Sequence, residues 1–184
     1  LVGLVGSEMC IRDSYYIMPI KTPVCDFGRK AENFELKSTE NKLISLNDIK
    51  GENGTLIMFI CNHCPYVKAI IKDVVEDCTK LNDLGINSVA ICSNDPINYP
   101  EDSFEKMIEF AIKHKFNFPY LIDETQNIAR KYDAVCTPDF FGYDKDFGLQ
   151  YRGRIRELKE LKPVRSGVSV LFIAMRQVSE TGKG

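Results

Sequence analysis

A buried strand that runs directly into an amphipathic helix restricts the fold of this sequence more than any other feature. Residues 55–60, TLIMFI, form a continuous apolar run of strand length, which is typical of a strand covered on both faces of a sheet. From Pro65 the apolar spacing becomes helical, and Gly85 is placed to end that helix. Residues 86–92, INSVAIC, follow and are predicted to form a second buried strand. This order predicts a βαβ unit with a right-handed crossover.

The flanking segments predict further strands. Residues 34–49 alternate apolar and polar side chains, which indicates two short strands joined by a turn at 38–41. Residues 139–144 and 149–154 are expected to form a hairpin with its turn at 145–148.

Helix-capping residues mark the remaining helices. A helix is expected over about 103–115. Asp123, with Gln126 three residues later, indicates a capping box for a second, short helix. Ser166 is expected to cap the last helix. The apolar face of that helix is predicted to consist of Val168, Leu171, Phe172, Met175 and Val178.

Size and composition exclude several classes of protein. A chain of 184 residues predicts one domain. Lys and Arg number 24 against 26 Asp and Glu, and this net charge of -2 argues against a nucleic-acid binder. No apolar run approaches the ~18 residues that a membrane span needs. The seven cysteines, an odd number, predict mostly free thiols in a reducing compartment, so we expect a cytoplasmic protein.

The N-terminal end does not resemble a folded element or a secretory signal. Residues 1–14, LVGLVGSEMCIRDS, are interrupted by Gly3 and Gly6 and lack a basic start. They resemble a translated sequencing adapter. We therefore expect residues 1–17 to be a non-native or disordered leader, and residues 18–184 to be the folded domain.

The strongest chemical signal is Cys61-Asn62-His63-Cys64-Pro65, at the junction of strand and helix. A CxxC motif either binds a metal or exchanges thiols. A structural zinc site usually needs four ligands, and the other cysteines of this chain are isolated from one another. We therefore favour redox chemistry over a zinc or iron–sulfur site, and predict no metal and no cofactor.

The position of the motif gives the redox interpretation its physical basis. A helix N-terminus presents unpaired N–H groups and about half a positive charge. A thiol placed there ionises more easily, and the thiolate is the nucleophile. We predict that Cys61 is the exposed attacking thiol and Cys64 the more buried resolving thiol. The alternative is a pair of ordinary core cysteines.

Four further residues are predicted to tune the site or to dock a substrate. His63 can hydrogen-bond to the Cys61 thiolate and raise the reduction potential, unless it points into solvent. Pro65 suits the first turn of a helix. Thr137-Pro138 precedes a predicted strand. A trans turn proline is the default there, because only about 5–6% of X–Pro bonds are cis; a cis bond would expose the Thr137 backbone to an extended peptide.

The other polar and thiol side chains are assigned structural roles. Cys78 and Cys92 are expected in the core, and Cys25 is expected to be inert. Cys136 either packs or acts as an auxiliary thiol. Asp139 is expected to be a solvated turn residue.

The order of elements and several sequence segments resemble a known family. The order of elements is similar to the thioredoxin fold, and ENFELKSTENKLISLNDIKGENGTLIMFICNHCPYVKAI resembles the opening of the redoxin branch, the alkyl hydroperoxide reductase/thiol-specific antioxidant superfamily. SNDPINYPEDSFEKM, FPYLIDETQNIARKYDAVCTPDFFGYD and LQYRGRI agree with it. The resemblance covers about 27–180 and is strongest to a peroxiredoxin-like group with a CNHCPYV-type motif.

The resemblance implies a thioredoxin-like α/β fold with a central mixed sheet flanked by helices and a redoxin-type N-terminal hairpin. It also implies a cis Pro138. Members of the group commonly continue beyond the present C-terminal end, which implies that this chain is truncated there.

The resemblance to true peroxiredoxins is incomplete. They share a P-x-x-x-T-x-x-C pattern, and if Cys64 takes the peroxidatic position, Cys61 stands in place of the threonine and Ile57 in place of the proline. We therefore predict a thiol–disulfide oxidoreductase. The alternatives are a weak thiol peroxidase with Cys64 as peroxidatic thiol, and a redox-sensing module that binds peptides at Thr137-Pro138.

The expected partners follow from this activity. They are protein or small-molecule disulfide substrates and a dithiol electron donor, with no nucleic acid and no membrane. A monomer or weak homodimer is expected.

Overall fold

The computed structural model describes residues 25–164 and 166–184. The predicted leader, residues 1–17, lies outside the described residues. None of the helices in the described part of the chain is long and apolar enough to cross a membrane.

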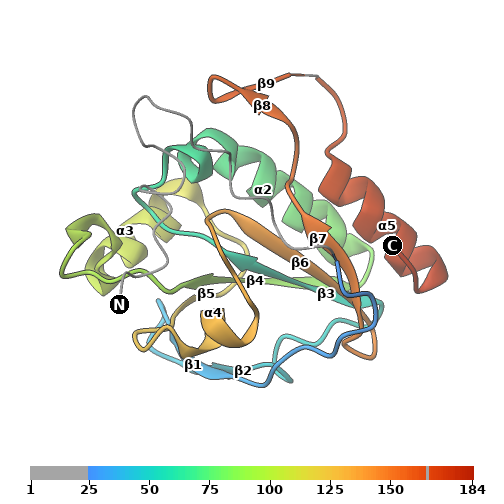
Figure 1. The fold of residues 1–184 in the computed structure, drawn as a ribbon, viewed down its shortest axis with the longest axis horizontal. Coiled ribbons are helices and arrows are strands. Elements are labelled where there is room, and N and C mark those ends of the chain that lie inside the picture. The colour runs from blue at the N-terminus through green and yellow to red at the C-terminus, as the bar shows by residue number, and fades with distance from the viewer. Residues whose placement is uncertain (1–24, 165) are drawn as a thin grey trace.

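Seven strands form one mixed sheet in the order β2-β1-β5-β4-β3-β6-β7 (Figure 1). β3 and β5 both run parallel to β4 between them, whereas β6 is antiparallel to β3 and to β7, and β1 is antiparallel to β2 and to β5. The strands are β1 (Glu35–Ser38), β2 (Leu43–Ser45), β3 (Gly54–Phe59), β4 (Ile86–Cys92), β5 (Tyr120–Ile122), β6 (Asp139–Asp144) and β7 (Leu149–Gly153). The predicted parallel pair and both predicted hairpins are confirmed.

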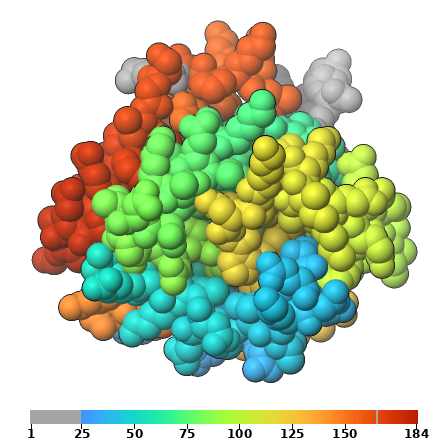
Figure 2. All heavy atoms as spheres, turned by 180° about the vertical axis from the view of Figure 1, so that it is seen from behind, coloured from blue at the N-terminus to red at the C-terminus, as the bar shows by residue number. Residues whose placement is uncertain are grey.

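Helices cover both faces of this sheet, as Figure 1 shows for α2 and α5 on one side and α4 on the other. The helices are α2 (Pro65–Asp83), the 3₁₀ turn η1 (Pro100–Asp102), α3 (Phe104–His114), α4 (Asn127–Lys131) and α5 (Val170–Thr181). A small hairpin of β8 (Leu158–Lys159) and β9 (Lys162–Pro163) precedes α5. From behind, Figure 2 shows this hairpin and α5 along one side of the molecule, with α2 next to α5.

Alternate side chains of β3 enter two separate cores, as expected for a strand covered on both faces. Leu56 and Met58 pack with residues of α2, α3 and α5, such as Met107. Ile57 and Phe59 pack on the opposite face with residues that include Ile128 of α4. The apolar run 55–60 is therefore packed on both faces of the sheet, and it leads directly into Cys61.

Three sequence predictions about the helices are corrected. α5 is capped by Ser169, whose hydroxyl accepts the N–H of Phe172 at 2.9 Å, and not by Ser166; Val168, assigned to the apolar face, is 66% exposed. The carboxylate of Asp123 does accept two N–H groups of α4. Gln126, however, binds Arg130 and does not complete a capping box.

Asp139, predicted to be a solvated turn residue, is wholly buried. It begins β6 beside the last residue of β3, and Arg152 of β7 reaches its carboxylate at 3.0 Å. The neighbouring strand thus supplies the cation that allows a carboxylate to be buried there.

Candidate active site

The sheet register brings the two separated parts of the predicted site together. Phe59, at the end of β3, pairs with Asp139 at the start of β6. Cys61 follows Phe59 by two residues and Thr137 precedes Asp139 by two, so the two must meet at the same edge of the sheet. The Thr137–Pro138 peptide bond is cis, as the resemblance implies.

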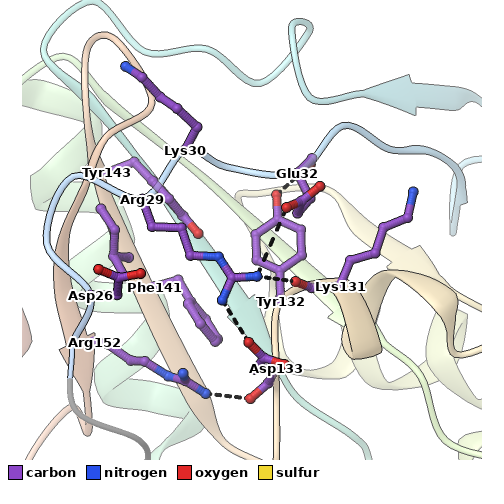
Figure 3. A pocket seen from close by; sticks show the side chains of 11 residues that line it. Asp26, Arg29, Lys30, Glu32, Lys131, Tyr132, Asp133, Phe141, Tyr143 and Arg152 are labelled. Atoms are coloured by element: carbon purple, nitrogen blue, oxygen red, sulfur yellow. Dashed lines mark hydrogen bonds and ion pairs between the residues drawn. The ribbon is translucent and has the colours of Figure 1, made fainter.

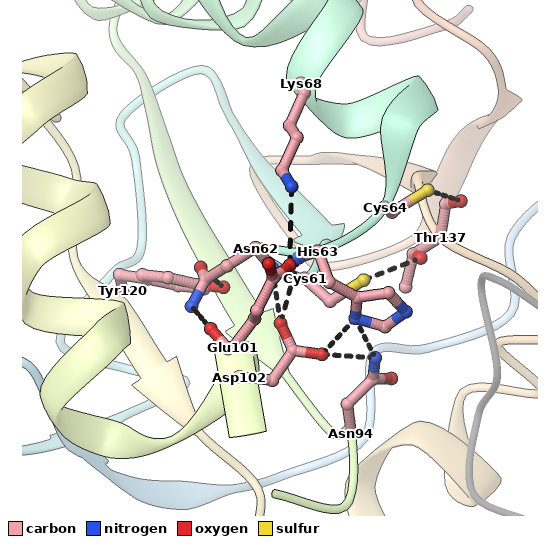
Figure 4. Close-up of polar contacts among 10 residues, drawn as sticks. All are labelled: Cys61, Asn62, His63, Cys64, Lys68, Asn94, Glu101, Asp102, Tyr120 and Thr137. Carbon is pink, nitrogen blue, oxygen red and sulfur yellow. Dashed lines mark hydrogen bonds and ion pairs between the residues drawn. The ribbon is translucent and has the colours of Figure 1, made fainter. Parts of the chain in front are cut away.

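Thr137 contacts both sulfurs of the motif. Its hydroxyl lies 3.2 Å from Cys61 Sγ, and its carbonyl oxygen lies 3.3 Å from Cys64 Sγ. Figure 4 shows both contacts on the same side of the motif. The structure thus groups Cys61, Cys64, Thr137 and Pro138, and Pro65 is the first residue of α2, as predicted.

Cys64, rather than Cys61, occupies the helix N-terminus. It is the N-cap residue of α2, and the N–H groups of Tyr66 and Val67 are directed at its sulfur. The hydrogen bond from Cys61, followed by these N–H groups, lowers the pKa of Cys64 to about 6 in spite of burial. The contact with the Thr137 carbonyl oxygen favours the protonated form of Cys64. This single acceptor is outweighed by the several donors directed at the same sulfur.

Cys61 has the opposite electrostatics. Its hydrogen bond to Cys64 raises the Cys61 pKa, and burial and the nearby carboxylate of Asp102 raise it further. Neither sulfur-bearing residue is exposed at all, so the prediction that Cys61 is the exposed thiol is wrong. α2 begins at Pro65, as the apolar spacing predicts, so Cys64 is its N-cap and Cys61 lies three residues before that cap.

His63 is held by a buried carboxylate instead of by Cys61. Its ring Nδ1 contacts Asp102 Oδ2, and the ring stacks on Tyr99 with centroids 4.6 Å apart. The side chain is 11% exposed, which rules out a histidine pointing into solvent. The hydrogen bond to Asp102 raises the pKa of His63.

Asp102 also fixes the backbone of the motif (Figure 4). Its Oδ1 accepts the N–H of Asn62 at 2.7 Å and that of His63 at 3.1 Å. Asn94 Nδ2 donates to Asp102 Oδ2 at 2.8 Å. The Asn62 side chain is bound in turn by the hydroxyl of Tyr120 at 3.0 Å. The CxxC loop is therefore held from two other elements.

Sequence reasoning missed these polar partners, although a signal was present. The segment SNDPINYPED follows β4 directly, and β4 is the parallel neighbour of β3. Because parallel strands end at the same edge of a sheet, polar residues after β4 face the motif after β3. Asn94, Tyr99 and Asp102 all come from that segment.

The side chains of Cys61, His63 and Asp102 are types that bind metal ions, and one atom of each lies within 4.8 Å of the others. Both oxygens of Asp102 already accept hydrogen bonds from the motif and from Asn94. Metal ligation by Asp102 would break these bonds, and we assign no metal here.

The remaining described cysteines differ from the motif pair. Burial raises the pKa of both Cys78 and Cys92 to about 12, consistent with their predicted place in the core. Cys25 is half-buried, and burial raises its pKa. Cys136 is also half-buried, with its Sγ 4.0 Å from the carbonyl oxygen of Pro138.

A second polar region lies on the α4 side of the sheet, around a pocket of about 210 Å³ (Figure 3). Arg29 binds the carboxylate of Asp133 at 2.6 Å, and Arg152 donates to the Asp133 carbonyl at 2.5 Å. The two guanidinium groups thus connect the first described segment and β7 to Asp133, the second residue after α4. We interpret this pocket as a structural junction.

The fold and the site define a thioredoxin-fold protein with two thiols at the start of a helix. The thioredoxin domain of a thiol-disulfide oxidoreductase from Bacteroides vulgatus matches the fold with a TM-score of 0.60 at 15% identity, over 71% of this chain and 90% of that one. A family model described as AhpC/TSA matches residues 27–158. The chain belongs to the AhpC/TSA family.

Named relatives and a solved structure agree with this assignment. The thiol-disulfide oxidoreductase ResA of Bacillus thuringiensis is 25% identical, over 79% of this chain and 77% of its own length. The peroxiredoxin Bcp of Bacillus subtilis is 27% identical, over 70% and 73%. An uncharacterised conserved protein from Geobacillus kaustophilus has a TM-score of 0.79 at 37% identity, over 91% and 89%. With the family, these relatives identify the chain as an oxidoreductase.

Proposed function

We propose that the protein exchanges thiols for disulfides through Cys61 and Cys64. The observation that carries this proposal is the electrostatic asymmetry of the pair. Cys64 caps α2 and has a pKa lowered to about 6, whereas the hydrogen bond to Cys64, burial and Asp102 raise the pKa of Cys61. One sulfur is thus a thiolate at neutral pH and the other a thiol in hydrogen-bond contact with it.

The thiolate is the nucleophile, so we assign the first attack to Cys64 and the resolving step to Cys61. This reverses the order inferred from the sequence, which relied on Cys61 lying at the helix N-terminus.

The exchange is balanced in atoms and electrons. The Cys64 thiolate attacks one sulfur of the substrate disulfide, the substrate S–S bond breaks, and the first substrate thiol leaves with the electron pair and takes up a proton. Cys61 then loses its proton and attacks Cys64 Sγ, which releases the second substrate thiol. Two electrons have passed to the substrate, and Cys61 and Cys64 are left as a disulfide.

Reduction of a disulfide substrate by the purified protein tests the proposal. We expect insulin disulfides and a small aromatic disulfide to be reduced when a chemical dithiol regenerates the protein. Cys61→Ser and Cys64→Ser should each lose multiple turnover. Cys78→Ser is the matched control, because it removes a buried thiol of α2 outside the site. Turnover that survives both motif substitutions would contradict the proposal.

Peroxide reduction is the second candidate, and the lowered pKa of Cys64 is the observation that favours it. A thiolate can break the O–O bond of a peroxide to give a sulfenic acid, which Cys61 would condense to a disulfide with release of water. The similarity to the peroxiredoxin Bcp supports the same candidate. Stopped-flow reaction of the reduced protein with hydrogen peroxide separates it from disulfide exchange.

The third alternative is a redox-sensing module that docks peptides at Thr137-Pro138. It predicts peptide binding without turnover, so the insulin assay distinguishes it from both enzymatic candidates. Protein or small-molecule disulfides are the proposed substrates, and a separate dithiol is the proposed electron donor. A cytoplasmic location and a monomer or weak homodimer stay predictions from the sequence.

A further inference from the structure

Several groups of the CxxC loop bind the carboxylate of Asp102. Asp102 is wholly buried. It is the last residue of η1, which follows β4 in the sequence. It accepts the N–H groups of Asn62 and His63 and contacts the His63 ring. A buried carboxylate needs such partners to remain ionised, and the loop that carries both cysteines supplies most of them.

The His63 ring is held in one orientation by this arrangement. Asp102 engages Nδ1, and Tyr99 stacks on the ring with an interplanar angle of 5°. The other ring nitrogen, Nε2, is buried and has no hydrogen-bond partner among the described residues. A carboxylate on Nδ1 directs the mobile proton of a neutral imidazole to that side, and leaves Nε2 as the basic nitrogen.

The same groups lie close to the reacting sulfurs. Cys61 Sγ, a ring nitrogen of His63 and an oxygen of Asp102 are all within 4.8 Å of one another. Lys68 of α2 does not neutralise Asp102, since it pairs with Glu101 at 3.4 Å. The charged and titratable groups that face the His63–Asp102 pair are Cys61, Cys64, Lys68, Cys92, Tyr99, Glu101 and Tyr120.

We propose that Asp102 is a positioning residue for the dithiol, acting through His63: it keeps Cys61 protonated in the resting enzyme and orients His63 to move the protons of the exchange. This inference rests on the proposed function and deepens it. His63 starts as an imidazolium paired with Asp102 and gives its proton to the first substrate thiolate that leaves. The neutral ring then takes the proton of Cys61 as Cys61 attacks Cys64 Sγ, and is an imidazolium again.

The test uses Asp102→Asn in the reduced, full-length protein, with ¹³C-labelled cysteine and ring-proton NMR to titrate each group. We expect the pKa of Cys61 and that of His63 each to fall by about one to three units, because a neighbouring negative charge has been removed. In single turnover at pH 7, release of the mixed disulfide should slow on the order of 10²-fold, the usual loss of a general base.

Asp77→Asn is the matched control. Asp77 is also a buried carboxyl that binds a neighbouring side chain, Ser169, but it faces α5. It should lower stability without moving the titrations of Cys61 or His63. If Asp102→Asn does not fold, Asp102→Glu keeps the charge and should retain the high pKa of Cys61, while His63→Gln should slow both proton-transfer steps, the first attack and the release of the mixed disulfide.

Titrations of Cys61 and His63 that match in Asp102→Asn and in the wild type would overturn the inference. So would mixed-disulfide release at the wild-type rate in His63→Gln. Because the titrations need no substrate, they remain decisive even if the wild type reduces no disulfide, in which case the proposed function fails separately.

Discussion

The hydroxyl of Thr137 lies 3.2 Å from the sulfur of Cys61, although the two residues are 76 positions apart in the chain. Antiparallel pairing of β3 with β6 creates this contact, because each residue lies two positions beyond the pair Phe59 and Asp139. The same threonine reaches Cys64 through its carbonyl oxygen. Thr137 therefore links the CxxC motif to the start of β6.

Removing that hydroxyl should raise the pKa of both cysteines. The Thr137 side chain is one of the hydrogen-bond partners that lower these values, and one such bond contributes about 1 kcal/mol. Thr137→Val, which keeps the shape, should raise the pKa of Cys64 by less than about one unit. Thr79→Val is the control, because the Thr79 hydroxyl binds only residues outside the site. An unchanged Cys64 titration would remove Thr137 from the set of tuning residues.

Iodoacetamide should label Cys64 before Cys61 in the reduced protein at pH 7. The thiolate reacts, and the pKa of Cys64 is about 6 whereas that of Cys61 is raised. Peptide mapping after short labelling gives the order, and Cys78, which is also buried but whose pKa is raised to about 12, serves as an internal reference for a protonated thiol. If Cys61 is alkylated first, the roles return to those inferred from the sequence.

Peroxide should be a poor substrate even though Cys64 is ionised. With Cys64 as the peroxidatic thiol, Ile57 and Cys61 stand in place of the proline and threonine of the peroxiredoxin pattern. Precise positioning of a reactant can contribute on the order of 7–11 kcal/mol at best. We expect slow oxidation by hydrogen peroxide in stopped-flow measurements, compared with an efficient peroxiredoxin under the same conditions. Comparable rates would favour the peroxidase candidate.

The reduction potential should fall when His63 is replaced by glutamine. The Cys64 thiolate is among the charges that raise the pKa of His63, so the imidazolium in turn stabilises the reduced state. Loss of about 1.4 kcal/mol would lower the potential by about 30 mV. Equilibration with glutathione redox buffers measures it, and His114→Gln, on α3, is the control. A potential that is unchanged or higher would show that His63 does not tune the couple.

The contribution of Asp139 to the free energy of unfolding should decrease as the pH rises from 5 to 7. Burial raises its pKa to about 6 although Arg152 opposes the shift, so the folded state binds this proton more tightly than the unfolded state. The resulting stability is present below the unfolded pKa and is lost as pH rises through about 6. Over this range the wild type should lose about 1 kcal/mol more of unfolding free energy than Asp139→Asn.

Urea unfolding of both proteins at the two pH values measures this difference. The variant leaves Arg152 without its carboxylate, so it should be less stable throughout, and only the change with pH is diagnostic. His63 and Cys64 titrate in both proteins and cancel in the comparison. Equal pH dependence would place the pKa of Asp139 outside this window.

Local sequence patterns were sufficient to predict the frame of the fold. The patterns of β3 and β4 are those of buried strands, and the spacing after Pro65 is that of an amphipathic helix. Such patterns depend only on residues that are close in the sequence. The CxxC motif could be placed at the strand–helix junction for the same reason. The alternating side chains of 34–49 likewise predicted the first hairpin, and the turn at 145–148 predicted the second.

Tertiary structure alone decided how the site works. The start of α2 at Pro65 follows from the sequence, but only the folded loop shows that the helix N–H groups are directed at Cys64 and that Cys61 lies beside Asp102. Asp102 of η1 lies near Cys61, and Arg152 of β7 pairs with Asp139, so both partners come from other elements of the fold. Ionisation inside a protein depends on such neighbours through burial, charge and hydrogen bonds, and their distances are properties of the folded chain, not of sequence order.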